Sequence, residues 1–141
     1  MTKLIIFSDG GARGNPGPAG IGAVLYDENK KIIAEISEYL GETTNNQAEY
    51  RALLAALKKA ASLKAEEVTC YLDSELVVRQ LNREYKVKNK DLAPLFLEVY
   101  NLSLSFQKIT FKHIPREQNS VADSLANEAM DRGVPKILSD V

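Results

Sequence analysis

The chain changes character at Gly41, and this change limits its fold more than any other feature of the sequence. Before Gly41, three apolar segments at 3–9, 21–26 and 31–39 are separated by a glycine-rich stretch and a polar turn, which is typical of β-strands joined in a meander. After Gly41, apolar residues take a helical spacing, and strands then alternate with helices. This order predicts one mixed sheet with helices packed on its faces.

The part after Gly41 begins with a long helix over residues 44–62. Thr44 is a favourable N-cap, and Gln47 three residues later completes a capping box. The apolar side chains of this helix share one face: Tyr50, Leu53, Leu54, Leu57 and Ala61. Strands are expected at 66–72 and 108–114, and helices at 74–82, 92–104 and 120–132, the last ended by Gly133. The order predicts an α/β fold whose five-stranded sheet combines an antiparallel meander with parallel strands.

The composition fits a single globular domain. A length of 141 residues is enough for one core, which we assign to residues 1–133, followed by a C-terminal tail at 134–141 that Ile137 and Leu138 could dock. The only cysteine, Cys70, lies in an apolar run and is expected to be a buried, unreactive thiol. No apolar run approaches the ~18 residues of a membrane span. The start of the chain has no signal-peptide pattern, so a cytoplasmic location is expected.

Asp9 is the last residue of the first predicted strand and precedes five glycines and two prolines within residues 10–20. A strand that ends on a carboxylate and continues into glycine-rich backbone can present a metal ligand or approach a phosphate. When Asp9 is considered alone, a hairpin turn with a solvated aspartate is the simpler explanation. The positions of the other carboxylates in the chain distinguish between these two interpretations.

Three further carboxylates lie where an active site would need them. Asp73 ends the fourth predicted strand, and neighbouring strand ends form the ligand crevice of many α/β sheets, although an aspartate there can also be a helix N-cap. Glu49 borders the apolar stripe of the long helix, where a carboxylate is costly unless it is paired or binds a metal. Asp123 follows Ser120 by three residues and, judged alone, fits a capping box at the start of the last helix.

Four motifs occur in order along the chain. They are Asp9-Gly10-Gly11 with Gly14-Asn15-Pro16-Gly17-Pro18, then Thr44-Asn45-Asn46-Gln47-Ala48-Glu49, then Asp73-Ser74, and finally Ala122-Asp123-Ser124-Leu125-Ala126. Together they resemble the motifs of type 1 ribonuclease H, over roughly residues 3–132. The resemblance implies the ribonuclease H-like fold and a metal-dependent endonuclease. Such an enzyme hydrolyses the RNA strand of an RNA/DNA hybrid and leaves 5′-phosphate and 3′-hydroxyl ends.

The resemblance also implies roles for individual residues. Asp9, Glu49, Asp73 and Asp123 would hold two Mg²⁺ ions, with Mn²⁺ as a substitute and Asp9 as the bridge. Two such ions can activate a water and stabilise a leaving oxygen in phosphodiester hydrolysis. The residues expected to contact the minor groove of the hybrid are Gly11, Ala12, Asn15, Asn45 and Asn46. Thr44 and Arg13 would contact phosphates, and the glycines would let the backbone approach the duplex.

Two features depart from the pattern of many family members. A histidine often assists product release from the loop before the last acid, but His113 is predicted at a strand end and can have a purely structural role there. The loop over residues 115–119 resembles a branch in which an arginine takes that place, so Arg116 is the first choice. The lysine-rich protrusion that holds the DNA strand in many members is reduced here to a short connection with Lys86, Lys88 and Lys90. These lysines can contact phosphates, or they can simply be solvated.

Two other functions fit parts of the pattern. A non-catalytic module on the same fold would bind hybrids or double-stranded RNA, but such a module would be expected to lose one of the four acids. A phosphotransferase similar to acetate or sugar kinases would use an Asp-Gly phosphate loop, but 141 residues leave no second domain to close over ATP. The preferred interpretation is a monomeric nuclease whose partner is an RNA/DNA hybrid, with double-stranded RNA as a further candidate and no membrane partner.

Overall fold

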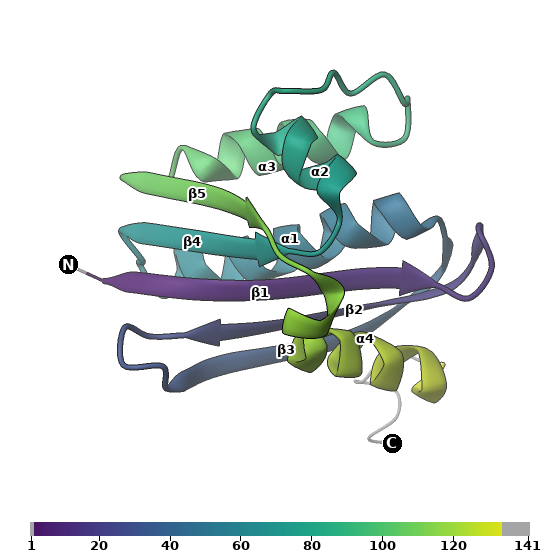
Figure 1. Ribbon diagram of the computed structural model, residues 1–141, viewed down its shortest axis with the longest axis horizontal. Coiled ribbons are helices and arrows are strands. Elements are labelled where there is room, and N and C mark those ends of the chain that lie inside the picture. Colours follow the sequence, from purple (N-terminus) through teal and green to yellow (C-terminus); the bar gives the residue numbers. More distant parts are fainter. Residues whose placement is uncertain (1, 134–141) are drawn as a thin grey trace.

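A single five-stranded sheet organises the computed structural model, which describes residues 2–133 (Figure 1). The strands are β1 (Lys3–Ala12), β2 (Gly17–Tyr26), β3 (Ile32–Thr43), β4 (Glu67–Leu72) and β5 (Lys108–His113). They lie in the order β3-β2-β1-β4-β5. The β1–β2 and β2–β3 pairs are antiparallel, and the β1–β4 and β4–β5 pairs are parallel. The predicted meander extended by parallel strands is confirmed.

The helices cover both faces of this sheet. They are α1 (Asn45–Ser62), α2 (Glu75–Leu81), α3 (Ala93–Ser103) and α4 (Ser120–Arg132), with a short 3₁₀ turn at Arg116–Gln118. α1 packs on β1 and β2 with α3 beside it, and α4 packs on the other face of the sheet, against β1, β2 and β3 (Figure 1). Within residues 2–133, no helix combines the length and the apolar character needed to cross a membrane.

The apolar face of α1 supplies much of the core, as its spacing predicts. Tyr50, Leu53 and Leu57 are fully buried in one cluster with apolar residues of the sheet. The Tyr50 hydroxyl donates to Oε1 of Gln80 at 2.7 Å, so the polar atom of this core residue is satisfied. Cys70 is fully buried in β4, and burial raises the pKa of its thiol. The predicted burial of Cys70 is therefore confirmed, and a buried thiol of this kind is expected to be unreactive.

The sequence pattern predicts that the first strand ends at Asp9. In the structure, β1 continues to Ala12. Its pairing with β2 runs from Ile5 opposite Tyr26 to Ala12 opposite Ala19, so most of the glycine-rich stretch is extended strand. The parallel pairing with β4, by contrast, stops at Ser8 opposite Leu72. Asp9 is therefore the first residue of β1 beyond the parallel ladder, although it lies inside the strand.

Gly10 and Gly22 explain how helices approach both faces of the sheet closely at this point. A Cβ atom at Gly10 would collide with the carbonyl group of Ala48 in α1, and one at Gly22 would collide with the carbonyl group of Ala122 in α4. These two glycines serve internal packing, whereas the expected approach of a duplex to the glycine-rich stretch stays a prediction. Gly11 is different, because a Cβ atom there would meet no atom closer than 3.8 Å.

The end of the last helix also follows the sequence prediction. Gly133 has a φ of 64°, in the left-handed region that favours glycine, and its N–H donates to the carbonyl of Ala129. The predicted tail at 134–141, with Ile137 and Leu138, lies outside the described residues.

Candidate metal and nucleic-acid site

Three of the four predicted acids meet where the β1–β4 ladder ends. Asp9 comes from β1, Glu49 from the N-terminal part of α1, and Asp73 from the position directly after β4. One carboxylate oxygen of each residue lies within 4.8 Å of the others. Asp9 is 8% exposed and Glu49 is 6% exposed, so the burial predicted for Glu49 from the helix spacing is confirmed.

Asp123 reaches the same place from α4. Its side chain is 31% exposed and is close enough to Asp9 for the two side chains to form a hydrogen bond. Asp9, Glu49, Asp73 and Asp123 together line a cavity of about 410 Å³, which we call the carboxylate cleft. The four acids, which are spread over more than a hundred residues of sequence, thus belong to one site.

The capping roles that the sequence leaves open for two of these acids are not used. The N-cap of α2 is Ser74, whose hydroxyl accepts the Val77 N–H at 3.3 Å, so Asp73 does not cap that helix. The capping box expected between Ser120 and Asp123 is wrong, because α4 has its N-cap at Asn119 and Ser120 is already the first helical residue. Helix capping therefore accounts for neither carboxylate.

The buried carboxylates bind protons more tightly than solvated ones. Burial raises the pKa of Asp9 to about 7, and the nearby charges of Asp73 and Asp123 act in the same direction. Burial, followed by the charge of Asp9, also raises the pKa of Glu49 well above its usual range. The Asp9 and Glu49 side chains also interact directly, which lowers the pKa of Asp9 and raises the pKa of Glu49. Carboxylates at this spacing resist full ionisation unless a cation compensates their charge.

The donor set fits Mg²⁺ or Mn²⁺. Carboxylate oxygens are the hard ligands that such ions prefer, and a cation would offset the repulsion between the acids. Oε2 of Glu49 is buried and has no hydrogen-bond partner among the described residues. A buried carboxylate oxygen without a partner is costly, and coordination of a cation would satisfy it. No second group of three or more such ligands is found within residues 2–133.

Two asparagines tie the tip of the β1–β2 hairpin to the start of α1. Oδ1 of Asn45 accepts the Ala12 N–H at 2.7 Å, and Oδ1 of Asn15 accepts the Asn45 N–H at 3.1 Å. Because a backbone N–H can donate only to the oxygen of a side-chain amide, both NH₂ groups are left to donate elsewhere. Asn45, Asn46, Gly11 and Ala12 line the carboxylate cleft.

Thr44 caps α1 as predicted, but the predicted capping box is only half formed. The Thr44 hydroxyl accepts the Gln47 N–H at 3.3 Å. The Gln47 side chain does not return to the backbone of Thr44, because its Oε1 accepts a hydrogen bond from the Thr43 hydroxyl at 2.8 Å.

Two predicted basic contacts are paired with residues of α4. Nη2 of Arg13 lies 2.6 Å from Oδ1 of Asp131 and also donates to Oδ1 of Asn127 at 3.4 Å. Nη2 of Arg116 lies 3.6 Å from Oδ1 of Asp123, and the Arg116 side chain is 78% exposed. Both arginines line the carboxylate cleft.

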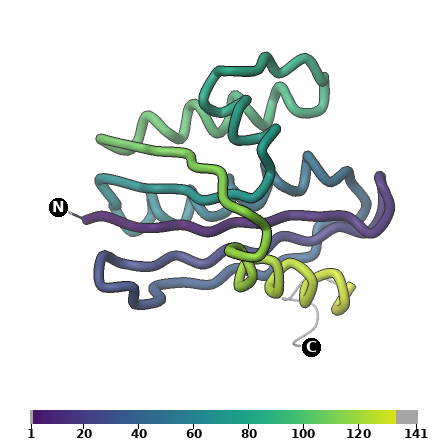
Figure 2. Tube along the Cα trace, in the orientation of Figure 1, coloured from purple at the N-terminus to yellow at the C-terminus, as the bar shows by residue number. Residues whose placement is uncertain are grey.

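The remaining predicted residues lie outside the lining of the cleft. His113 is exposed at the end of β5, opposite Leu72. Lys86, Lys88 and Lys90 are exposed on the connection between α2 and α3, which runs along the edge of the molecule farthest from α4 in Figure 2.

Sequence reasoning missed Asn119, which the pattern assigns to a loop. Its side chain is 1% exposed, and Nδ2 donates to Oδ2 of Asp73 at 3.0 Å. It also missed Asn127 and Met130, which line the cleft from α4. The spacing of these two residues from Asp123, four and seven positions, places them on the same helix face and is the signal that could have found them.

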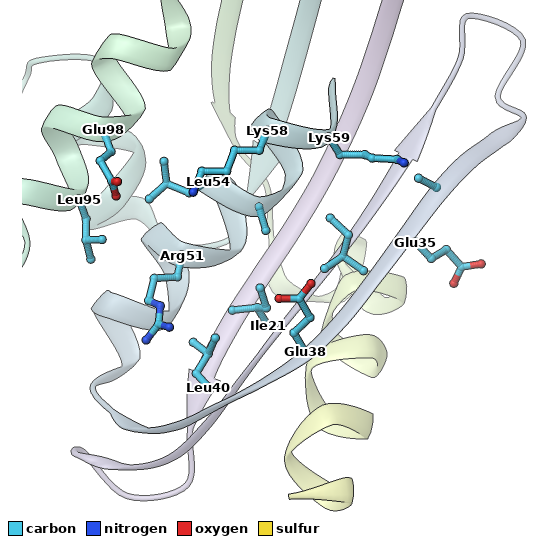
Figure 3. A pocket seen from close by; sticks show the side chains of 13 residues that line it. Ile21, Glu35, Glu38, Leu40, Arg51, Leu54, Lys58, Lys59, Leu95 and Glu98 are labelled. Carbon is cyan, nitrogen blue, oxygen red and sulfur yellow. The ribbon is translucent and has the colours of Figure 1, made fainter. Parts of the chain in front are cut away.

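A larger cavity of about 670 Å³ lies between β3, α1 and α3, and we call it the α1–α3 cavity (Figure 3). Its charged residues carry both signs: Glu35, Glu38 and Glu98, with Arg51, Lys58 and Lys59. Leu54 and Leu95 contribute apolar surface from the two helices (Figure 3). This mixture gives no cluster of ligands for a metal and no uniform charge for a nucleic acid.

A mixed sheet of this order, with a carboxylate cluster at the end of its central parallel ladder, defines a ribonuclease H-like domain. Residues 7–129 match the family model described as "Reverse transcriptase-like". The bifunctional protein Rv2228c of Mycobacterium tuberculosis is 43% identical over 139 residues, which are 98% of this chain but only 38% of that protein. Ribonuclease H of Helicobacter acinonychis is 41% identical over 138 residues, covering 89% of this chain and 92% of that protein.

Solved structures agree with these relatives. LC11-RNase H1 in complex with an RNA/DNA hybrid has a TM-score of 0.87 and 47% sequence identity, over 92% of this chain and 97% of that one. This chain belongs to the ribonuclease H family, in the type 1 branch of the relatives named ribonuclease HI.

Proposed function

We propose that this chain is a metal-dependent endonuclease that hydrolyses the RNA strand of RNA/DNA hybrids. The observation that carries the proposal is the meeting of Asp9, Glu49 and Asp73 within 4.8 Å, in a cleft that Asp123 also lines. Membership of the ribonuclease H family and the similarity to LC11-RNase H1, which was solved with such a hybrid, supply the substrate class.

The four acids would hold two Mg²⁺ ions, with Mn²⁺ as a substitute and Asp9 as the shared ligand. When bound, such ions supply activation of a water and stabilisation of the leaving oxygen, which yields 5′-phosphate and 3′-hydroxyl ends. The contribution of the chain is to keep the buried carboxylates of Asp9 and Glu49 close to Asp73 before any ion arrives. Preorganisation of this kind avoids rearrangement of the ligands during the reaction.

Recognition of the hybrid would depend on the asparagines beside the cleft. Asn15 and Asn45 are exposed and use their oxygens within the protein, so their NH₂ groups would be the donors to a bound duplex. The minor groove of a hybrid presents acceptors on base edges and the 2′-hydroxyl oxygens of the RNA strand. Gly11, Ala12 and Asn46 would complete this contact.

Phosphates would be contacted by Thr44, at the start of α1, and by the basic residues. The free N–H groups of a helix start favour an anion at Thr44. Arg13 would have to exchange its exposed ion pair with Asp131 for a phosphate. Lys86 and Lys88 would reach the DNA strand only as the duplex extends past α2 and α3. Between the two candidates for assisting catalysis, Arg116 is favoured over His113, because Arg116 lines the cleft beside Asp123.

The test is cleavage of an end-labelled hybrid with and without Mg²⁺, by the wild-type chain and by Asp9→Asn. We expect cuts in the RNA strand that need the metal and that Asp9→Asn abolishes. Binding without cleavage would support the non-catalytic module instead. Hybrids with a run of ribonucleotides and with a single ribonucleotide should be compared, because type 1 behaviour requires the run. The proposal also includes double-stranded RNA as a substrate, a monomeric state and a cytoplasmic location. The same cleavage assay tests double-stranded RNA, and sedimentation tests the monomeric state.

A further inference from the structure

Asn119 is a buried polar residue whose side chain joins two parts of the carboxylate cleft. It lies between the 3₁₀ turn and α4 and is 1% exposed. Its Nδ2 donates to the backbone carbonyl of Ser8 at 2.9 Å and to Oδ2 of Asp73 at 3.0 Å. Ser8 directly precedes Asp9, so one amide group contacts both the chain that carries Asp9 and the carboxylate of Asp73.

These two bonds occur where the backbone no longer holds the strands together. The parallel β1–β4 ladder ends at Ser8 opposite Leu72, one residue before Asp9 and Asp73. Beyond this point the chain after β4 turns into α2, and no ladder bond fixes Asp73 relative to β1. The Asn119 amide spans this gap from a third segment of the chain.

Packing alone does not explain an asparagine at this position. Oδ1 of Asn119 is buried and has no hydrogen-bond partner among the described residues. A buried acceptor without a partner is unfavourable, so an apolar side chain of similar size would suit the interior better. The two bonds donated by Nδ2 are therefore the reason to expect an amide here.

We propose that Asn119 is a positioning residue that holds the Asp73 carboxylate toward Asp9 and Glu49 so that the three can share a metal ion. A ligand that is hydrogen-bonded by an outer partner is oriented before the metal binds, and loss of such partners typically weakens metal affinity or activity by about 10–100-fold. The inference rests on the proposed function, because it assigns Asn119 a role in the same metal site.

The test measures Mn²⁺ affinity by calorimetry in the wild-type chain, Asn119→Leu and Asn119→Ala. Leucine keeps the volume of the side chain and removes the unpaired acceptor, so this variant remains informative if the alanine variant does not fold. We expect the Mn²⁺ dissociation constant to rise about tenfold in a folded variant. We also expect kcat on a hybrid to fall at limiting Mn²⁺ and to recover at high Mn²⁺, with little change in KM.

The matched control is Asn89→Ala. Asn89 also uses its side chain to bind backbone, accepting the N–H groups of Asp91 and Leu92 before α3, far along the chain from the cleft. Mn²⁺ affinity should not change in this variant. Unchanged affinity in a folded Asn119→Leu, or an equal loss in Asn89→Ala, would overturn the positioning role.

A measurement without metal separates this inference from the proposed function. In NMR spectra of the metal-free protein, the side-chain NH₂ of Asn119 should exchange slowly with water, and Asp73→Ala should accelerate that exchange. Rapid exchange in the wild type would contradict the Asn119–Asp73 bond. If the wild type binds no Mn²⁺ and cuts no hybrid, the proposed function fails. If it binds Mn²⁺ and Asn119→Leu binds equally well, only the role of Asn119 fails.

Discussion

The carboxylate cleft and the α1–α3 cavity differ in a way that distinguishes a chemical site from a surface hollow. The α1–α3 cavity is the larger, at about 670 Å³ against about 410 Å³, but its three acids, Glu35, Glu38 and Glu98, are all exposed. The carboxylate cleft places four acids together, two of them less than 10% exposed. Burial of like charges is unfavourable for stability, so it is the stronger indication of function.

The largest expected effect comes from removing one acid from the carboxylate cleft and, for comparison, one acid from the α1–α3 cavity. Asp9→Asn should lower kcat on a hybrid by about 10³-fold or more, because it removes a shared metal ligand and with it several kcal/mol of transition-state stabilisation. Glu38→Gln, in the α1–α3 cavity, should leave kcat unchanged. Both are measured by hybrid cleavage in saturating Mg²⁺. Equal effects of the two substitutions would contradict the assignment of the site to the carboxylate cleft.

The second prediction concerns the stability of the metal-free protein. The folded-state pKa of Asp9 is raised to about 7, so the folded chain holds a proton that the unfolded chain loses at lower pH. The contribution of Asp9 to the free energy of unfolding should therefore be complete below about pH 4 and fall by about 2–4 kcal/mol as the pH rises to 8. Denaturant titrations at several pH values measure this fall.

Two controls accompany the pH series. Mg²⁺ at pH 8 should recover part of the lost stability, because it binds only the folded chain. Glu49→Gln should flatten the pH dependence, because it removes one of the two buried carboxylates. If the metal-free protein gained stability between pH 5 and pH 8, the pKa values of the buried carboxyl groups would not be raised.

The cleft also shows which parts of the site a sequence can reveal. Glu49 was predictable because its burial follows from helix periodicity, a local signal. The end of β1 was predicted wrongly because a run of glycines resembles a loop, whereas the register with β2 depends on pairing between segments. Asn119 was missed because its partners, Ser8 and Asp73, lie 111 and 46 residues away along the chain. Local patterns together with the family resemblance located the acids, but they did not show what holds the acids in place.

The third prediction separates hybrid binding from metal binding. Asn45→Asp keeps an oxygen to accept the Ala12 N–H but removes the NH₂ group and adds a negative charge. KM for the hybrid should rise about fivefold or more, as expected for the loss of a hydrogen bond. Mn²⁺ affinity measured by calorimetry should stay within a factor of two. An unchanged KM would show that the Asn45 side chain does not contribute to hybrid binding.

The smallest effect is expected for the lysines of the connection between α2 and α3, which we compare with lysines of the α1–α3 cavity. Lys86→Ala with Lys88→Ala should weaken hybrid binding only a few-fold at moderate salt. If both lysines bind phosphates, the slope of log affinity against log salt should become shallower by about one for each lysine removed. Lys58→Ala with Lys59→Ala removes the same charge from the α1–α3 cavity and should not change that slope. Equal slopes for the two double variants would mean that the hybrid senses only total charge, and that Lys86 and Lys88 are solvated residues of a connecting loop.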